Sequence, residues 1–134
     1  MVRADVKEFI RCHGLLHGVG SECGVYAVTI DGYVAYVGKS KNMLKTCFGH
    51  IARTVNKTPL SRRFYRVLFD AWINKHVVDC KVLETCPESA LAEKEKEALL
   101  KFDPPLNTRM PNGPRDLGKM TLAKLMPILR KKVK

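Results

Sequence analysis

The chain has 134 residues, of which 24 are lysine or arginine and 13 are aspartate or glutamate, so its formal net charge is +11. This length and an apolar fraction of 46% are typical of one globular domain and exclude a disordered chain. No apolar run is long enough for a membrane-spanning helix or a signal peptide, so we expect no membrane partner and a cytoplasmic location.

The cysteines support an intracellular location. The sequence contains five of them, scattered and without a Cys-x-x-Cys pair, which favours a reducing compartment, and we expect a bacterial or phage origin. A zinc site is the alternative use for Cys12, His13, His17 and Cys23. Finger-type zinc sites usually have a more regular cysteine spacing, so a helix end followed by a glycine-rich loop is the favoured interpretation.

Basic residues are concentrated in two zones. Residues 39–75 contain nine bases and one acid, residues 109–134 contain eight bases and one acid, and residues 76–103 between them contain four bases and seven acids. Two separate basic zones favour a polyanionic partner that contacts both the centre and the C-terminal tail of the chain. We therefore prefer nucleic acid as the partner over the alternative, an ordinary solvated surface.

The first elements in chain order are a short amphipathic helix and a hairpin. Apolar spacing predicts a helix over 4–13, followed by a glycine-rich loop over 14–24. Two β-branched and aromatic runs, 25–30 and 33–37, flank Asp31-Gly32, a strong signal for a two-residue hairpin turn. With that turn Tyr26 lies opposite Val37, and the side of the sheet on which Tyr36 lies depends on the register or on a bulge.

Two amphipathic helices follow the hairpin. Ser40 is expected to cap a helix that runs to about residue 53, with Thr46 and His50 on a shared face away from its apolar stripe of Leu44, Cys47, Phe48, Ile51 and Val55. The second helix is expected over 59–75. It has Arg62, Arg63 and Arg66 on its polar face, opposite an apolar stripe of Leu60, Phe64, Val67, Leu68, Ala71 and Trp72.

A third strand over 77–83 and an acidic helix come next. Thr85-x-x-Glu88 resembles a capping box that starts a helix over about 87–102, and Pro104-Pro105 ends it. At ~100° per residue, Glu95 falls in the middle of the apolar face of this helix, where a carboxylate is costly unless it is paired or binds a metal. Glu95 is therefore the preferred candidate ligand, and a carboxylate at the rim of a cleft is the alternative.

The tail contains a last helical pattern. Pro127 is expected to kink that helix, and its apolar positions are Leu122, Leu125, Met126, Leu129 and Val133. We divide the chain into an N-terminal helix and loop over 1–23, a central domain over 24–109 and a basic tail with a short helix over 110–134.

Several short motifs, taken in order, resemble the GIY-YIG nuclease family. Gly24-Val25-Tyr26 and Tyr36-Val37-Gly38 are separated by nine residues, and Lys39-Ser40-Lys41-Asn42 continues the second motif. His50 falls where many members have a histidine, and the run from Glu95 to Pro104-Pro105-Leu106-Asn107 is similar to the metal-binding helix and its terminal Pro-x-x-Asn. Each motif alone is weak, but together they span about 22–109 in the expected order.

The resemblance implies an α+β fold, a small three-stranded antiparallel sheet flanked by helices, and a divalent-metal-dependent endonuclease. Tyr26 would position or deprotonate the attacking water, and Tyr36 would orient that water or the phosphate. Glu95 would bind a single Mg²⁺ or Mn²⁺, which neutralises charge on the phosphate. Gly38 would allow close backbone approach, His50 would contact the phosphate region, and Asn107 would hold the end of the glutamate helix. Ordinary strand packing is the alternative for both tyrosines.

One position departs from the family pattern. Thr46 stands where members usually have an arginine that stabilises the transition state, and loss of such a donor typically costs ~10²–10³ in rate. Lys39, Lys45 or Arg53 could supply the charge. The main prediction is thus a DNA endonuclease, and the alternative is a weakened or inactive nucleic-acid-binding module. A third possibility is a basic protein that binds an acidic partner.

The basic side chains complete the expected site. Residues expected to bind the DNA backbone without reading its sequence are Lys41, Lys45, Arg53, Arg62, Arg63, Arg66, Arg109 and the terminal Arg130-Lys131-Lys132.

A homodimer is possible, because one site in a small chain either nicks DNA or needs a partner for a double-strand cut.

Overall fold

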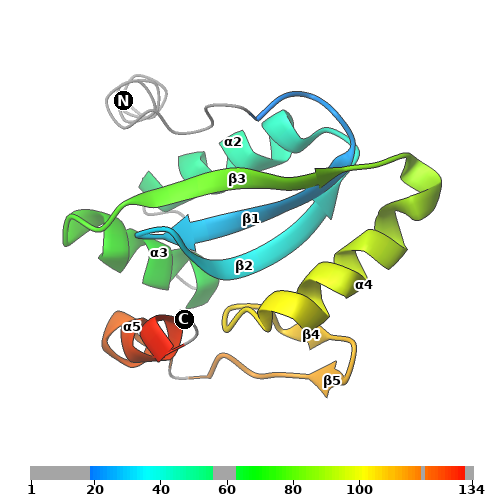
Figure 1. Cartoon of the computed structure of the whole chain (residues 1–134). Helices are drawn as coiled ribbons and strands as arrows, with labels where there is room; N and C mark the ends of the chain where they lie inside the picture. Colours follow the sequence, from blue (N-terminus) through cyan, green and yellow to red (C-terminus); the bar gives the residue numbers. More distant parts are fainter. Residues whose placement is uncertain (1–18, 56–62, 119, 132–134) are drawn as a thin grey trace.

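The computed structural model describes residues 19–55, 63–118 and 120–131. Its centre is a three-stranded antiparallel sheet in the order β2-β1-β3, formed by β1 (Gly24–Ile30), β2 (Tyr33–Ser40) and β3 (Val78–Thr85). The helices are α2 (Met43–Val55), α3 (Arg63–Ile73), α4 (Leu91–Phe102) and α5 (Leu122–Lys131). Figure 1 shows α2 and α3 behind the sheet and α4 and α5 beside β2. The predicted α+β class and three-stranded sheet are confirmed.

The turn between β1 and β2 has the predicted geometry, but the strand register differs. Asp31 and Gly32 have φ values of 53° and 86°, and Ile30 pairs with Tyr33, as a two-residue turn requires. A bulge follows, because Thr29 pairs with Val34 while Val28 pairs with Tyr36. The expected pairing of Tyr26 with Val37 is therefore wrong, and Tyr26 faces Gly38. The extra residue in β2 is what places Tyr26 and Tyr36 on the same face of the sheet.

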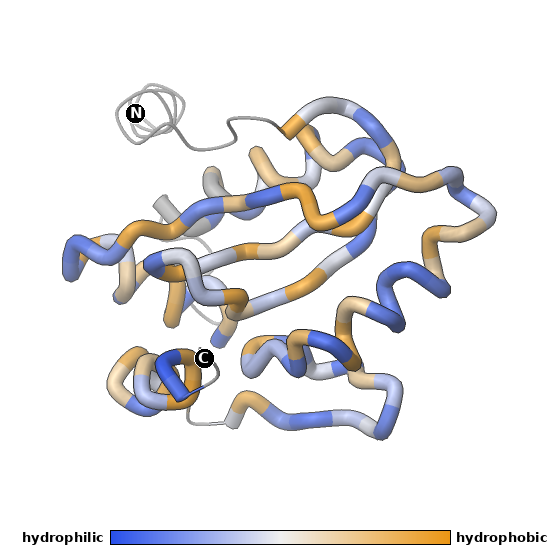
Figure 2. The backbone as a smooth tube through the Cα atoms, in the orientation of Figure 1, coloured by the Kyte–Doolittle hydropathy of each residue, from blue (hydrophilic) through white to orange (hydrophobic). Residues whose placement is uncertain are grey.

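The sheet is covered on both faces. Tyr26, Val28 and Ile30 of β1 pack in one cluster with side chains from α2, α3 and α5. Val25 and Val37 point to the opposite face, where they pack in a second cluster with Leu91 and Leu99 of α4. Figure 2 shows hydrophobic segments along the strands and hydrophilic segments along α4. The sheet therefore lies between the two clusters, and β2 is an edge strand because the strand order is β2-β1-β3.

Helix α2 starts later than predicted, and a different set of its side chains faces the core. Ser40 is the last residue of β2, and the side chain of Asn42 accepts the Lys45 N–H at 3.1 Å in the first turn of the helix. Met43 is fully buried, whereas Leu44 is 41% exposed, so the predicted apolar stripe is wrong at its first position. The inner side of the helix instead includes His50, which contacts Tyr26.

The other helices agree in type with the predictions, and α4 differs at its start. Helix α3 is described from Arg63, residues 59–62 of its predicted span lie outside the described residues, and its buried side chains include Phe64, Val67, Leu68 and Ala71 of the predicted stripe. The proposed capping box is wrong, because Thr85 ends β3 and a 3₁₀ turn, η1 (Glu88–Ala90), precedes α4 without a side-chain cap. The strand predicted over 77–83 is confirmed as β3.

The segment after α4 contains a small hairpin that the sequence analysis missed. Strands β4 (Arg109–Met110) and β5 (Gly113–Pro114) pair around Pro111-Asn112. The helix predicted in the tail is confirmed as α5, with Pro127 inside it and with Leu125, Met126 and Leu129 buried. Because Leu125 and Leu129 belong to the main cluster, this part of the tail packs against the sheet domain.

Some predictions fall outside the described residues. These are the helix over 4–13, the zinc-ligand candidates Cys12, His13 and His17, the side chains Arg62 and Lys132, and the apolar positions Leu60 and Val133. Cys23 is described as a free, half-buried cysteine. No helix among the described residues is long and apolar enough to cross a membrane.

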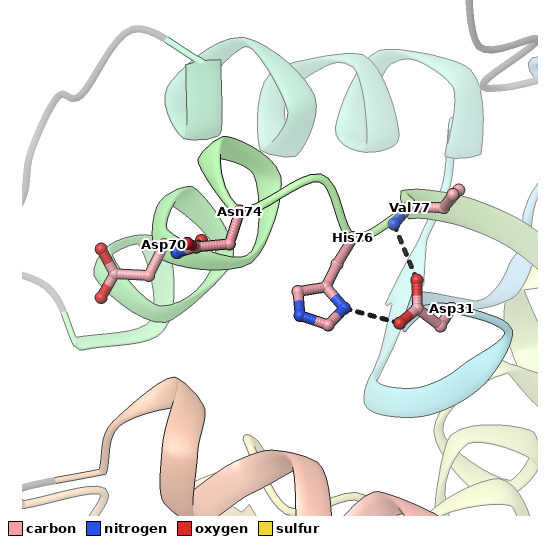
Figure 3. Close-up of polar contacts among 5 residues, drawn as sticks. All are labelled: Asp31, Asp70, Asn74, His76 and Val77. Atoms are coloured by element: carbon pink, nitrogen blue, oxygen red, sulfur yellow. Dashed lines mark hydrogen bonds and ion pairs between the residues drawn. The ribbon is translucent and has the colours of Figure 1, made fainter.

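A polar network joins the hairpin turn to the start of β3 (Figure 3). The Asp31 carboxylate accepts the backbone N–H of Val77 at 2.9 Å and lies 2.6 Å from His76 Nδ1. Burial disfavours the charged carboxylate, yet the hydrogen bonds from His76 and Val77 outweigh this effect, so the pKa of Asp31 is lower than usual. In the same view Asn74 donates to the Asp70 carbonyl at 2.7 Å near the end of α3.

We expect Asp31→Asn to destabilise the fold by about 1 kcal/mol near neutral pH. Asparagine tolerates the left-handed backbone at this position, so the substitution mainly removes the charge. Because the folded-state pKa is lowered, the contribution of Asp31 is complete above its unfolded value of about 3.9 and is lost as the pH falls through the folded value. Urea unfolding at about pH 7 and about pH 3 measures this. A stability difference that is equal at both pH values would contradict the assignment.

Candidate active site

Tyr26 is a buried tyrosine whose hydroxyl lies over the backbone of Gly38. Its side chain is 2% exposed, and the two residues are paired across β1 and β2. A Cβ atom at Gly38 would overlap the Tyr26 hydroxyl, so only glycine allows the ring to lie across the neighbouring strand at this point. The close approach of the Tyr26 side chain to β2 therefore explains why residue 38 is a glycine.

His50 connects Tyr26 to a second buried tyrosine. Its Nε2 is 2.7 Å from the Tyr26 hydroxyl oxygen, and its Nδ1 is 2.9 Å from the hydroxyl oxygen of Tyr65. A neutral imidazole has one N–H and one acceptor nitrogen, so His50 donates to one of these tyrosines and accepts from the other. The three side chains form a continuous hydrogen-bonded chain from β1 through α2 to α3.

Tyr36 of β2 packs beside this hydrogen-bonded chain, and together with Tyr26, His50 and Phe64 it forms an aromatic cluster. Its ring centroid is 6.4 Å from that of Tyr26, 5.8 Å from that of His50 and 4.8 Å from that of Phe64. The rings of Tyr26 and Tyr36 meet edge to face, which is a favourable aromatic geometry. The two tyrosines therefore converge, which the sequence pairing alone left open.

Burial controls the proton of Tyr26. Loss of solvent around the phenol, with a smaller contribution from the neighbouring Tyr36, raises the pKa of Tyr26 far above its usual value. The hydroxyl therefore keeps its proton at neutral pH unless a base beside it accepts that proton. The base beside it is His50, at 2.7 Å.

Asn107 holds the exposed edge of β2. Its side-chain carbonyl accepts the Val37 N–H at 2.8 Å, and its amide donates to the Val37 carbonyl, also at 2.8 Å. An edge strand otherwise presents unpaired backbone groups, and Asn107 satisfies both groups of one residue. Asn107 is buried, so this contact fixes the backbone between Tyr36 and Gly38, the two site residues on either side of Val37.

Glu95 lies on the opposite face of β2, beside Lys39. Its Oε1 is 3.2 Å from the Lys39 ammonium, and its side chain is 24% exposed. Leu91 and Leu99, one turn away on either side, are buried, whereas Glu93 and Glu97 are exposed, so Glu95 does lie on the inner side of α4. Sequence reasoning thus placed Glu95 correctly on its helix, while the ion pair with Lys39 is new.

The donor set at Glu95 suits a hard divalent cation that retains waters. No group of three or more His, Cys, Asp and Glu residues that could hold a metal occurs within the described residues. A single carboxylate near a substrate phosphate is a common way to bind Mg²⁺, which keeps several water ligands. The ammonium of Lys39 occupies the carboxylate in this structure, so a cation would have to displace it.

Thr46 has no positive charge, and the cations near it do not take the place of the arginine that the family pattern has at this position. The Thr46 hydroxyl is 2.6 Å from the Ser40 hydroxyl. Lys41 pairs with Glu88 at 2.7 Å, away from the aromatic cluster, and Lys45 is exposed. Arg53 contacts one of the buried tyrosines, since its Nη1 is 3.4 Å from the Tyr65 hydroxyl oxygen.

The remaining basic candidates are spread over the surface. Arg66 and Arg109 are exposed, and Arg63 donates through Nε to the Gly118 carbonyl at 3.2 Å. The structure therefore brings together Tyr26, Tyr36 and His50 and joins Glu95 to Lys39, whereas Arg66 and Arg109 are exposed side chains outside these contacts.

Tyr65 is the site residue that sequence reasoning missed. It is 1% exposed, and it contacts both His50 and Arg53. In the sequence it is an aromatic residue of an amphipathic helix, and nothing in its spacing distinguishes it from core. Only the packing of α3 against α2 reveals that its hydroxyl reaches the imidazole.

The comparisons with known proteins give a fold likeness. No family model and no curated protein matches the chain. Crystal structures of point mutants of the GIY-YIG N-terminal endonuclease domain of UvrC from Thermotoga maritima, bound to their catalytic divalent cation, do match. An asparagine-to-alanine mutant is 22% identical over 76% of this chain and 98% of its own, with a TM-score of 0.44. A tyrosine-to-phenylalanine mutant is 17% identical over 81% and 100%, with a TM-score of 0.43.

These structures belong to the family that the sequence motifs resemble. Their identity and TM-scores describe a distant likeness of fold. The function proposed next is supported by the motifs and by the side-chain geometry of this chain.

Proposed function

We propose that this protein is a divalent-metal-dependent endonuclease that hydrolyses phosphodiester bonds of DNA. The observation that carries the proposal is the 2.7 Å contact between the buried Tyr26 hydroxyl and His50 Nε2. A tyrosine paired with a potential base, beside a second tyrosine in a chain of strongly positive net charge, suits the activation of water near a phosphate.

The tyrosine and the histidine would act as one unit. His50 accepts the Tyr26 proton, and the Tyr26 oxygen then accepts a proton from the attacking water. The protonated phenol is a poor base, and burial raises its pKa and so makes its proton harder to remove. The histidine is therefore required to accept that proton. Tyr36 lies on the same face and would orient the water or a phosphate oxygen.

Glu95 would hold the divalent cation, Mg²⁺ or Mn²⁺. When bound, the cation neutralises charge on the phosphoryl oxygens and polarises the P–O bonds. Lys39, released from Glu95, would then lie beside the phosphate as a second positive charge. Asn107 would keep the backbone between the two sets of side chains in place through its two bonds to Val37.

The basic side chains would bind the DNA backbone without reading its sequence. Arg53, Arg66 and Arg109 are exposed, Arg63 is half-buried, and Lys41 and Lys45 lie near the start of α2. Such contacts supply affinity and register rather than specificity. A homodimer and an intracellular location stay predictions.

A nucleic-acid-binding module without catalysis is the second candidate. It is favoured by one observation, that Thr46 bonds to Ser40 and leaves the site without the arginine that the family pattern implies. Arg53 reaches the site only through Tyr65, so it does not replace that arginine directly. Binding without turnover would follow if transition-state charge were left uncompensated.

Cleavage of supercoiled plasmid separates the two candidates. The purified protein with Mg²⁺ or Mn²⁺ should give relaxed or linear product, and EDTA should abolish it. A gel shift that weakens with added salt, without product in either metal, would refute the endonuclease and favour the binding module. Thr46→Arg is then the substitution that tests whether the missing arginine is the cause.

A further inference from the structure

A pocket of about 400 Å³ opens beside Tyr36 and His50. One wall comes from these two residues together with Phe64 and Arg63 at the start of α3. The other wall comes from the segment after α4, including Thr108, Asp116 and Gly118. The pocket is thus formed by the candidate active site and by chain that lies beyond its last sequence motif.

The second wall is held in place by several hydrogen bonds. The Leu106 N–H donates to the Ala35 carbonyl of β2 at 2.9 Å, and the Arg115 N–H donates to the Thr108 carbonyl at 2.7 Å. The Arg115 guanidinium donates to the Pro104 carbonyl at 3.1 Å and contacts Asp103. Arg63 of the first wall also donates to the Gly118 carbonyl of the second wall. The wall is therefore attached to both β2 and α3.

The lining combines three kinds of chemistry. The half-buried Tyr36 presents aromatic surface, backed by the buried Phe64, whose ring centroid is 4.8 Å away. Asp116 presents a carboxylate whose Oδ1 accepts the Gly118 N–H at 2.8 Å and which retains capacity for further donors. Arg63 presents a guanidinium. A bare phosphate would meet the carboxylate unfavourably, whereas a nucleotide can place its base on the rings and its phosphate at the guanidinium.

We propose that this pocket receives a single unpaired nucleotide next to the scissile phosphate, so that the substrate is a nucleic acid with an unpaired base. The inference rests on the proposed function, because it places the nucleotide beside Tyr36 and His50. A paired base in a duplex exposes only its groove edges, and its faces become available only when it leaves the stack. A pocket of this volume suits one small ligand.

The Asp116 carboxylate adds a preference among bases. A carboxylate accepts the exocyclic amino group of cytosine, whereas thymine presents a carbonyl oxygen at the same position. We therefore expect an unpaired cytosine to bind more tightly than an unpaired thymine, and Asp116→Asn to remove that difference, because an amide can serve either base.

The test is fluorescence anisotropy in EDTA, with end-labelled duplexes that are either fully paired or carry one bulged cytosine or thymine. The wild-type chain should bind the cytosine bulge about tenfold more tightly than the paired duplex, and more tightly than the thymine bulge. Asp116→Asn is compared with Glu93→Gln, which also removes one exposed negative charge but lies on α4, outside the pocket. Any general gain in DNA affinity from the lost charge appears in both variants, so only the ratio between bulges reports the pocket.

Equal affinity for paired and bulged DNA would overturn the proposal. A preference for the cytosine bulge over the thymine bulge that Asp116→Asn leaves unchanged would also overturn it, because the unpaired base would then bind elsewhere. Binding in EDTA does not depend on cleavage, so failure of the endonuclease proposal and failure of the pocket proposal are distinguishable. If the protein cleaves DNA but does not prefer unpaired bases, the pocket proposal fails and the endonuclease proposal stands.

Discussion

Glu95→Gln should lower metal-dependent cleavage about a thousandfold, because the several kcal/mol supplied by a bound cation correspond to about that factor in rate. The glutamine keeps the size of the side chain on the face of α4 that carries the buried Leu91 and Leu99, and it removes the charge that attracts the cation. The measurement is the initial rate of plasmid relaxation as a function of Mg²⁺ and Mn²⁺ concentration, with urea unfolding to confirm that the variant is folded.

Glu93→Gln provides the matched control for that experiment. It makes the same chemical change on the same helix at an exposed position, and it should retain the wild-type rate. If Glu95→Gln cleaves as fast as Glu93→Gln at every metal concentration, Glu95 is not the metal ligand, and its inward position on α4 serves only the ion pair with Lys39.

Tyr26→Phe should lower the cleavage rate by about 10²–10⁴, the usual contribution of a positioned acid or base. The ring remains in its place over Gly38, so the change removes only the hydroxyl that His50 contacts. Loss of this buried hydrogen bond should cost about 1 kcal/mol of stability, which is small beside the loss of rate. The rate is measured at saturating metal, together with the free energy of unfolding.

Tyr33→Phe is the control for the tyrosine experiment. Tyr33 lies on the same hairpin, at the start of β2 and only partly buried. The control variant should retain full activity when this hydroxyl is removed. If Tyr26→Phe cleaves DNA at the wild-type rate, the Tyr26–His50 contact is structural and does not carry the proton from the attacking water.

Local sequence patterns were sufficient for most of the fold. Asp31-Gly32 predicted the hairpin turn, because both positions require positive φ, and the structure has that turn. Apolar spacing predicted α2, α3, α4 and α5, since burial of one face is visible in a single helix. The inward position of Glu95 followed from the same spacing. Helix starts were less predictable, because Ser40 and Thr85 became strand residues through pairing with β1.

The candidate site was only partly predictable. The motif residues Tyr26, Tyr36 and His50 were named from the sequence, and their convergence depends on a bulge that no local pattern indicated. Tyr65 and the pocket wall around Asp116 were not found at all. Each of these depends on which side chains meet across α2, α3 and the segment after α4, and residues so far apart in sequence carry no shared periodic signal.

The sequence by itself determined the class of fold, the positions of the tyrosines, the histidine and the glutamate, and the strongly basic character that favours a polyanionic partner. These features depend on composition and on spacing within one element. Tertiary structure alone decided the strand register, the Tyr26–His50–Tyr65 chain, the Lys39–Glu95 pair and the pocket beside Tyr36. Contacts between elements are set by close packing in three dimensions, where the insertion of one residue in β2 reverses the side of the sheet that a side chain faces.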